Sequence, residues 1–204
     1  IAFTKQDSET GSVAQGEVTL VGAEFRVTLI SSEFFPNLVG HTETVTIGKD
    51  LTAKTSDKLP LGVYSVTEVK APTGYRFKED IPNVEIKHKG QTVPVVLEQK
   101  TVADDVIKGR ISVTKTDAET GDLLRNAKFE LRRNFANGDK RVVDVITTND
   151  KGIAVSGYHP YGNYQLVEIT APYGYTENID DRSKDVHDVF IDSHDKTYTI
   201  SQTN

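Results

Sequence analysis

The stretch YQLVEITAPYGY, residues 164–175, reads as a β-strand that runs into a Pro-Gly turn. Apolar and polar residues alternate along it, as expected for a strand with one buried face. Glu168 falls on the same face as Tyr164 and Leu166, so the alternation places a carboxylate in line with core residues. A near copy, YSVTEVKAPTGY, occupies residues 64–75, offset by one hundred positions. The motif therefore predicts, twice in the chain, a strand that carries an inward-facing glutamate.

Two further blocks repeat in the same order. FTKQDSETGS (residues 3–12) resembles VTKTDAETGD (residues 113–122), and GAEFRVTL (residues 22–29) resembles NAKFELRR (residues 126–133). Three matched blocks in one order predict two copies of one fold. We place the copies at residues 1–101 and 109–204, joined by a polar linker over residues 102–108.

Each copy has the pattern of an all-β domain. Short runs with a period of two are separated by turn signals such as NGDK (residues 137–140) and NDKG (residues 149–152). No amphipathic pattern extends over three helical turns. The sequence therefore predicts two tandem immunoglobulin-like β-sandwiches of roughly one hundred residues each.

Composition narrows the function. The chain of 204 residues has a net charge of −6 and no cysteine. The negative charge argues against nucleic acid or an anionic membrane as the main partner, and the apolar runs are too short for membrane insertion. Without cysteine there are no disulfides and no thiol chemistry. We also expect no cofactor, and a mature or trimmed chain, because no secretion signal is visible at its start.

Polar residues share the core face at three strand ends of the second copy. Continuing the alternation from Ile111 places Lys115 inward, and continuing it from Tyr198 places Asn204 inward, both with the parity of Glu168. These strands could simply end there, with the side chains reaching water. If the three groups are buried instead, burial lowers the pKa of the lysine and raises that of the glutamate.

Buried in this way, the three groups can react. A neutral amine is a nucleophile, the Asn204 carboxamide is an electrophile, and proximity supplies a high effective molarity. The predicted product is an amide between Lys115 and Asn204, with ammonia released and Glu168 as proton shuttle. The bond would close a loop of about ninety residues and, by analogy with disulfides, stabilise the domain by ~4–5 kcal/mol.

The motif set TK-x-D…ETG…A-x-F…G-x-Y-x-x-x-E-x-x-AP-x-GY resembles the CnaB-type (prealbumin-like, inverse immunoglobulin) domains of Gram-positive surface proteins. The resemblance covers nearly the whole chain, twice. It implies spontaneous Lys–Asn isopeptide bonds assisted by an acidic residue, with Lys115, Asn204 and Glu168 in these roles.

The first copy departs from this pattern. It has Lys5 and Glu68, but where the resemblance leads us to expect Asn or Asp, the alternation ends in Gln99, after Val93, Val95 and Leu97. A glutamine side chain is one methylene longer, and Asn83 is a poor substitute because of its place in a loop or early strand. We therefore expect the bond in the second copy, and Glu68 beside an unreacted Lys5 in the first, with Lys5–Gln99 the weaker pair.

The resemblance implies a non-enzymatic structural and adhesive protein whose only chemistry is its own cross-link. We expect a minor (ancillary or basal) pilin of sortase-assembled pili, anchored to the cell wall outside the cell. Its partners would be other pilin subunits or the cell wall, with host-surface molecules as further candidates. The absence of a recognisable pilin polymerisation lysine argues against a major shaft subunit. The alternatives are the repeat stalk of a wall-anchored adhesin, and an accessory or carbohydrate-binding module of a secreted enzyme.

Two other groups of residues invite functional readings. The acidic segment 177–195 contains His187 and His194, but its spacing matches no metal motif, so we expect a solvated loop and an outward strand face, and no metal. The aromatics of segment 30–50 could be adhesive, but we expect them to pack in the core or between domains. A sugar platform, if present, would use the exposed aromatics among Phe34, Phe35, Tyr158 and Tyr161.

Overall fold

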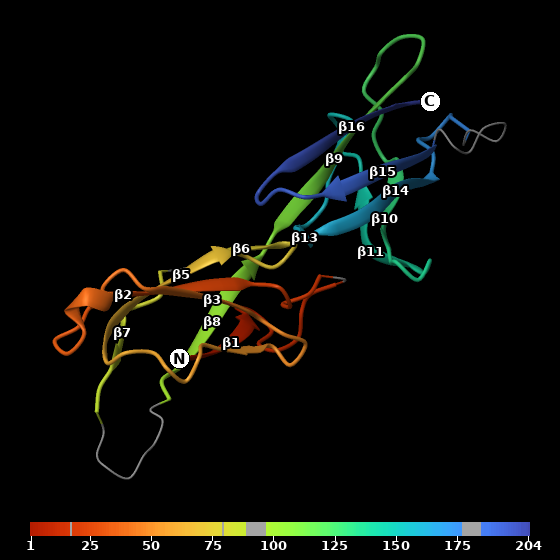
Figure 1. The fold of residues 1–204 in the computed structure, drawn as a ribbon. Coiled ribbons are helices and arrows are strands. Elements are labelled where there is room, and N and C mark those ends of the chain that lie inside the picture. Colours follow the sequence, from red (N-terminus) through yellow and green to blue (C-terminus); the bar gives the residue numbers. More distant parts are fainter. Residues whose placement is uncertain (17, 79, 89–96, 177–184) are drawn as a thin grey trace. The chain divides into compact units, whose positions relative to one another are not determined.

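A computed structural model describes residues 1–16, 18–78, 80–88, 97–176 and 185–204. It divides into two compact units, Ile1–Val106 and Ile107–Asn204, each built from β-strands (Figure 1). Each unit consists of two sheets around its own core. The prediction of an all-β chain of two sandwich domains is confirmed.

In the first domain, one sheet has the strand order β4-β1-β8-β6 and the other β3-β2-β5-β7. The strands of the first sheet are β4 (Thr52–Lys54), β1 (Ala2–Asp7), β8 (Gln99–Val106) and β6 (Tyr75–Phe77). Those of the second are β3 (Thr42–Thr46), β2 (Glu24–Ser31), β5 (Gly62–Lys70) and β7 (Val84–Ile86).

The second domain repeats this plan. One sheet has the order β11-β10-β14-β15, and in the other β9 pairs with β12, β13 and β16. The first comprises β11 (Lys140–Thr147), β10 (Lys128–Asn134), β14 (Gly162–Thr170) and β15 (Val186–Ile191). The second comprises β9 (Lys108–Thr116), β12 (Ile153–Val155), β13 (His159–Pro160) and β16 (Thr197–Thr203).

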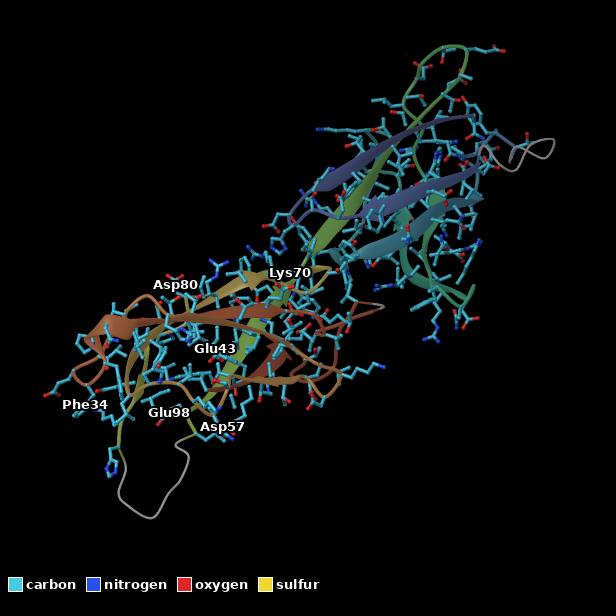
Figure 2. The ribbon with its side chains drawn as sticks, in the orientation of Figure 1. Phe34, Glu43, Asp57, Lys70, Asp80 and Glu98 are labelled. Atoms are coloured by element: carbon cyan, nitrogen blue, oxygen red, sulfur yellow. The ribbon has the colours of Figure 1, made fainter. Side chains whose placement is uncertain are left out.

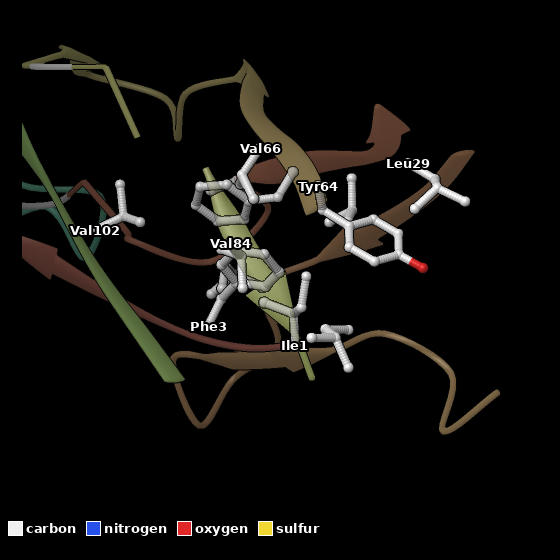
Figure 3. Packing of buried hydrophobic residues seen from close by; sticks show 12 residues of the cluster. Ile1, Phe3, Leu29, Tyr64, Val66, Val84 and Val102 are labelled. Carbon is white, nitrogen blue, oxygen red and sulfur yellow. The ribbon is translucent and has the colours of Figure 1, made fainter. Parts of the chain in front are cut away.

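Alternating residues of the facing strands form each core. In the first domain Phe3 stacks on Phe25 with ring centroids 4.7 Å apart, and Tyr64 packs nearby while its hydroxyl donates to the Pro60 carbonyl at 2.6 Å (Figure 3). The second domain repeats this last contact, since Tyr164 donates to the Pro160 carbonyl at the same distance. The G-x-Y element of the repeated motif thus anchors its strand in both cores.

The first and last strands of each domain pair in parallel. β1 pairs with β8 so that Lys5 lies opposite Val102, and β9 pairs with β16 so that Lys115 lies opposite Gln202. This pairing brings residues far apart in the sequence side by side, and it fixes which late residue each lysine meets.

Two expectations differ from the structure around the end of the first copy. Residues 102–106, expected as linker, belong to β8, and only Ile107 separates β8 from β9. Leu97, expected to face inward, is 45% exposed and precedes β8. Val93 and Val95 lie outside the described residues. The true last strand alternates in Val102, Asp104 and Val106, and its acidic residues gave it the composition of a linker.

The aromatics of segment 30–50 are not core residues. Phe34 is 68% exposed and Phe35 40% exposed on the loop that leads into the 3₁₀ helix η1 (Pro36–Leu38), where Figure 2 labels Phe34. The expectation of core packing is therefore wrong, because this loop extends beyond the sheets. No helix within the described ranges is long and apolar enough to cross a membrane.

Candidate cross-link sites

In the second domain, Lys115 and Glu168 meet inside the sandwich. Both side chains are fully buried, and Lys115 Nζ lies 3.0 Å from Glu168 Oε2. Nζ also donates to the Thr203 carbonyl at 3.1 Å, so the amine reaches the end of β16. Glu168 lies opposite Phe129 in the sheet register, which places an aromatic ring beside the pair.

Asn204 directly follows β16 at this point. Its backbone N–H donates to the Thr116 carbonyl at 3.0 Å, and its side-chain Nδ2 donates to the Thr176 carbonyl at 2.9 Å. Its Oδ1 is buried and accepts no hydrogen bond from the residues that the structure describes. The structure thus pairs Lys115 with Glu168 and places Asn204 directly after Thr203, whose carbonyl accepts a hydrogen bond from the lysine amine.

Burial also tunes the nucleophile. Removal from water lowers the pKa of Lys115, against the opposing effect of the Glu168 carboxylate. A lysine that loses its proton more readily spends more time as the neutral amine, which is the form that attacks a carbonyl carbon.

The first domain holds an equivalent site with a different third member. Lys5 is fully buried, and its Nζ lies 2.8 Å from Glu68 Oε2 and 2.7 Å from Asp104 Oδ1. Asp104 is 1% exposed on β8. The Phe25 ring, 5.6 Å from Nζ, lies opposite Glu68 in the register as Phe129 lies opposite Glu168.

Two carboxyl groups around one ammonium favour retention of a proton. Burial raises the pKa of Glu68 to about 7, opposed by Lys5 and reinforced by the neighbouring Asp104. Burial likewise raises the pKa of Asp104. Near neutral pH the site can therefore hold a protonated carboxyl beside the amine, which is what condensation to an amide requires.

Gln99 is not at this site. It is exposed at the start of β8 opposite Ala2, three positions before the residue that faces Lys5, so the pairing of Lys5 with Gln99 is wrong. Asn83 is exposed before β7. The sequence did contain a signal for Asp104: it precedes Asn204 by the same one hundred positions that separate Glu68 from Glu168. In both domains the candidate acceptor stands two residues beyond the residue opposite the lysine.

The ends of the repeated motifs also meet, which sequence reasoning missed. Tyr75 donates its hydroxyl proton to Asp7 Oδ2 at 2.8 Å, and Tyr175 donates to Asp117 Oδ2 at 2.5 Å. The aspartate of TK-x-D is thereby tied to the last tyrosine of AP-x-GY. The available signal was that both repeats contain this aspartate and this tyrosine at matching positions.

The remaining candidates lie elsewhere. His187, expected on an outward face, points its Nε2 at the buried Gln202 Oε1, 2.9 Å away. His194 Nδ1 accepts the Lys108 N–H at 3.3 Å. Tyr158 is 48% exposed, and Tyr161 packs edge-on against Phe190. Residues 177–184 of the acidic segment lie outside the described residues.

Comparison with known families identifies the class of these domains. A family profile described as "SpaA: Prealbumin-like fold domain" matches residues 1–101 and again 109–204. The chain therefore belongs to the prealbumin-like SpaA domain family and contains two such domains. The search of curated proteins found no match.

Several solved structures are similar to this chain. The TIE protein of Bacillus anthracis is 26% identical, with a TM-score of 0.72 over 99% of this chain, which spans 33% of that chain. A C-terminal fragment of the pilus adhesin SpaC from Lactobacillus rhamnosus GG is 17% identical, with a TM-score of 0.52, over 100% of this chain and 96% of that chain. The second likeness shows the fold alone. The chain thus shares its fold with both structures, and its likeness to the TIE protein extends to the sequence.

Proposed function

We propose that this chain is a covalently braced structural segment of a Gram-positive surface protein, with one self-formed isopeptide bond in each domain. The observation that carries the proposal is the repeated site: a buried lysine against the motif glutamate, with an acceptor on the last strand or directly after it. Lys5, Glu68 and Asp104 form it in the first domain.

The two bonds differ in their leaving group. In the first domain, Lys5 Nζ attacks Asp104 Cγ, the new C–N bond replaces a C–O bond, and one water leaves with a proton from the amine. In the second domain, Lys115 Nζ attacks Asn204 Cγ and one ammonia leaves. The motif glutamate accepts a proton from the lysine and returns one to the departing group.

The placement of the bonds suits a protein under tension. Each would join the first strand of a domain to its last, so force that arrives through one end of the domain would pass along the covalent link and bypass the sheet hydrogen bonds. A chain without cysteine gains in this way a brace that reductants leave intact.

The intact mass of the purified chain tests the proposal. We expect a mass lower than the sequence mass by one water and one ammonia. Lys5→Ala should abolish only the water loss, and Lys115→Ala only the ammonia loss, so each variant serves as control for the other. An unmodified chain that carries the full sequence mass would overturn the proposal.

Within this class, we propose a minor pilin subunit, joined by sortase to other subunits or to the cell wall. The match of both domains to the SpaA prealbumin-like family, and the same Lys–Glu pair in each of them, support this role. The stalk of a wall-anchored adhesin is the second candidate, favoured by the match to one third of the longer TIE protein chain.

Immunoblots of wall extracts from the producing cell separate the two roles. A pilin would give a ladder of polymers that resists boiling in detergent, and deletion of the pilin sortase would collapse it. A stalk would give one wall-released band whatever the state of that sortase.

A further inference from the structure

The second domain contains a buried glutamine that the cross-link chemistry above leaves unused. Gln202 is 4% exposed on β16, opposite Lys115. Its Nε2 donates to Glu168 Oε2 and, at 3.3 Å, to Asp185 Oδ1. Its Oε1 lies 2.9 Å from His187 Nε2. A buried carboxamide with partners at both ends is held in one orientation.

The chemistry of the residues around Gln202 sets the direction of its hydrogen bonds. Two carboxylates on one side require the amide NH₂ there, so the amide oxygen faces His187. His187 must then donate from Nε2–H. Hydrogen bonds therefore run from His187 to Gln202 and from Gln202 to Glu168, whose Oε2 also receives the Lys115 ammonium.

The same contacts distinguish Gln202 from the acceptor. Both ends of the Gln202 amide are engaged, and reaction at its carbon would break the hydrogen bonds at both. Within the described part of the chain, the buried Asn204 Oδ1 instead accepts no hydrogen bond, so it can take up a proton. Of the two carboxamides near Lys115, the geometry favours Asn204 for attack and Gln202 for support.

The first domain has a different residue opposite its lysine. Val102 takes the position of Gln202 opposite the lysine and has no hydrogen-bonding side chain. There the second group around the lysine is the Asp104 carboxyl itself, 2.7 Å from Lys5 Nζ. A carboxyl acceptor binds the ammonium directly, whereas Lys115 Nζ donates to Glu168 Oε2 and to the Thr203 carbonyl.

We propose that Gln202, held by His187, is a positioning residue that orients Glu168 for bond formation in the second domain. The inference rests on the proposed cross-link function. In this proposal the Gln202 amide donates to Glu168, and the His187 imidazole supports Gln202. The first domain must then react without an equivalent of either residue.

The test follows the two mass losses over time in the full chain, made by cell-free synthesis and quenched at intervals. Gln202→Met keeps the side-chain length but removes the hydrogen bonds. We expect it to slow ammonia loss roughly tenfold or more, because small errors of orientation are costly to such reactions. Water loss from the first domain should keep its rate, and Ser201→Ala, an exposed neighbour on β16, should change neither.

A second measurement separates positioning from a merely structural role. In the unlinked Lys115→Ala background, ¹⁵N NMR should show His187 with its proton on Nε2 and that signal should shift with Gln202→Met while the domain stays folded. An unchanged rate of ammonia loss in Gln202→Met, or a His187 that carries its proton only on Nδ1, would overturn the proposal. If the unsubstituted chain loses no ammonia at all, the same mass spectra show that the proposed cross-link itself is absent. If Gln202→Met fails to fold, the position of the His187 proton in the chain that keeps Gln202 still decides.

Discussion

At the scale of single residues, the identity of the acceptor divides two otherwise matched sites. Asp104 brings a second carboxyl to a buried lysine, whereas Asn204 brings a neutral amide. The first site can therefore exchange protons between its two carboxyls, and the second depends on Glu168 and its neighbours. The two bonds should respond differently to pH and to substitution.

Glu168→Gln should abolish the bond of the second domain. The amide can neither take the proton of Lys115 nor return one to the departing ammonia, and general acid–base catalysis typically contributes about 10²–10⁴-fold. Mass spectrometry of the purified variant should show loss of one water only. A variant that still loses ammonia at the unsubstituted rate would refute the shuttle role, and Glu130→Gln, on the outward side of β10, provides the control.

Bond formation in the first domain should quicken as pH falls from about 8 to about 6, because the departing hydroxyl of Asp104 needs a proton. Burial raises the pKa of Glu68 to about 7, so the folded site holds this proton below that pH and loses it above. The measurement is the rate of water loss at several pH values after cell-free synthesis. A rate that stays flat or rises with pH would argue against Glu68 as donor.

At the scale of elements, a hydrogen bond between the repeated motifs holds the end of the first strand of each domain. Asp7 Oδ1 accepts the N–H groups of Glu9 and Thr10, while its Oδ2 accepts the Tyr75 hydroxyl. Burial opposes ionisation of Asp7, yet these hydrogen bonds hold its pKa below the ordinary value. The end of β1, which carries Lys5, is thereby tied to the start of β6.

Tyr75→Phe should lower the unfolding free energy of the unlinked first domain by ~1–3 kcal/mol, because a buried carboxylate loses a donor. Tyr175→Phe should have a smaller effect, since the Asp117–Tyr175 pair is more exposed. Urea unfolding of both variants in the Lys5→Ala, Lys115→Ala background measures the difference. Equal effects would show that burial does not set the strength of this contact.

At the scale of the whole molecule, the chain is two units that each carry a core and a candidate cross-link site. A bond from Lys5 to Asp104 or from Lys115 to Asn204 would close a loop of nearly an entire domain. Its main effect is to restrict the unfolded chain, so its benefit belongs to one domain and not to its neighbour.

Loss of either bond should destabilise only its own domain. Lys5→Ala should lower the stability of the first domain by ~4–5 kcal/mol or more, a decrease in Tm of roughly 20–30 °C. Calorimetry should show one early transition and one unchanged, and Lys115→Ala should give the converse. A shift of both transitions in either single variant would contradict independent bracing.

The sequence by itself determined the duplication, the all-β class and the inward glutamates, because period-two alternation and a repeat offset are local and survive without coordinates. It also placed Lys5, Lys115 and Asn204 on core faces. Only the tertiary structure decided the partner of Lys5, because parallel pairing of β1 with β8 fixes a register that alternation cannot reveal. The acidic residues of β8 gave it the composition of a linker in the sequence. In the second domain, the corresponding pairing of β9 with β16 placed Gln202 beside Glu168.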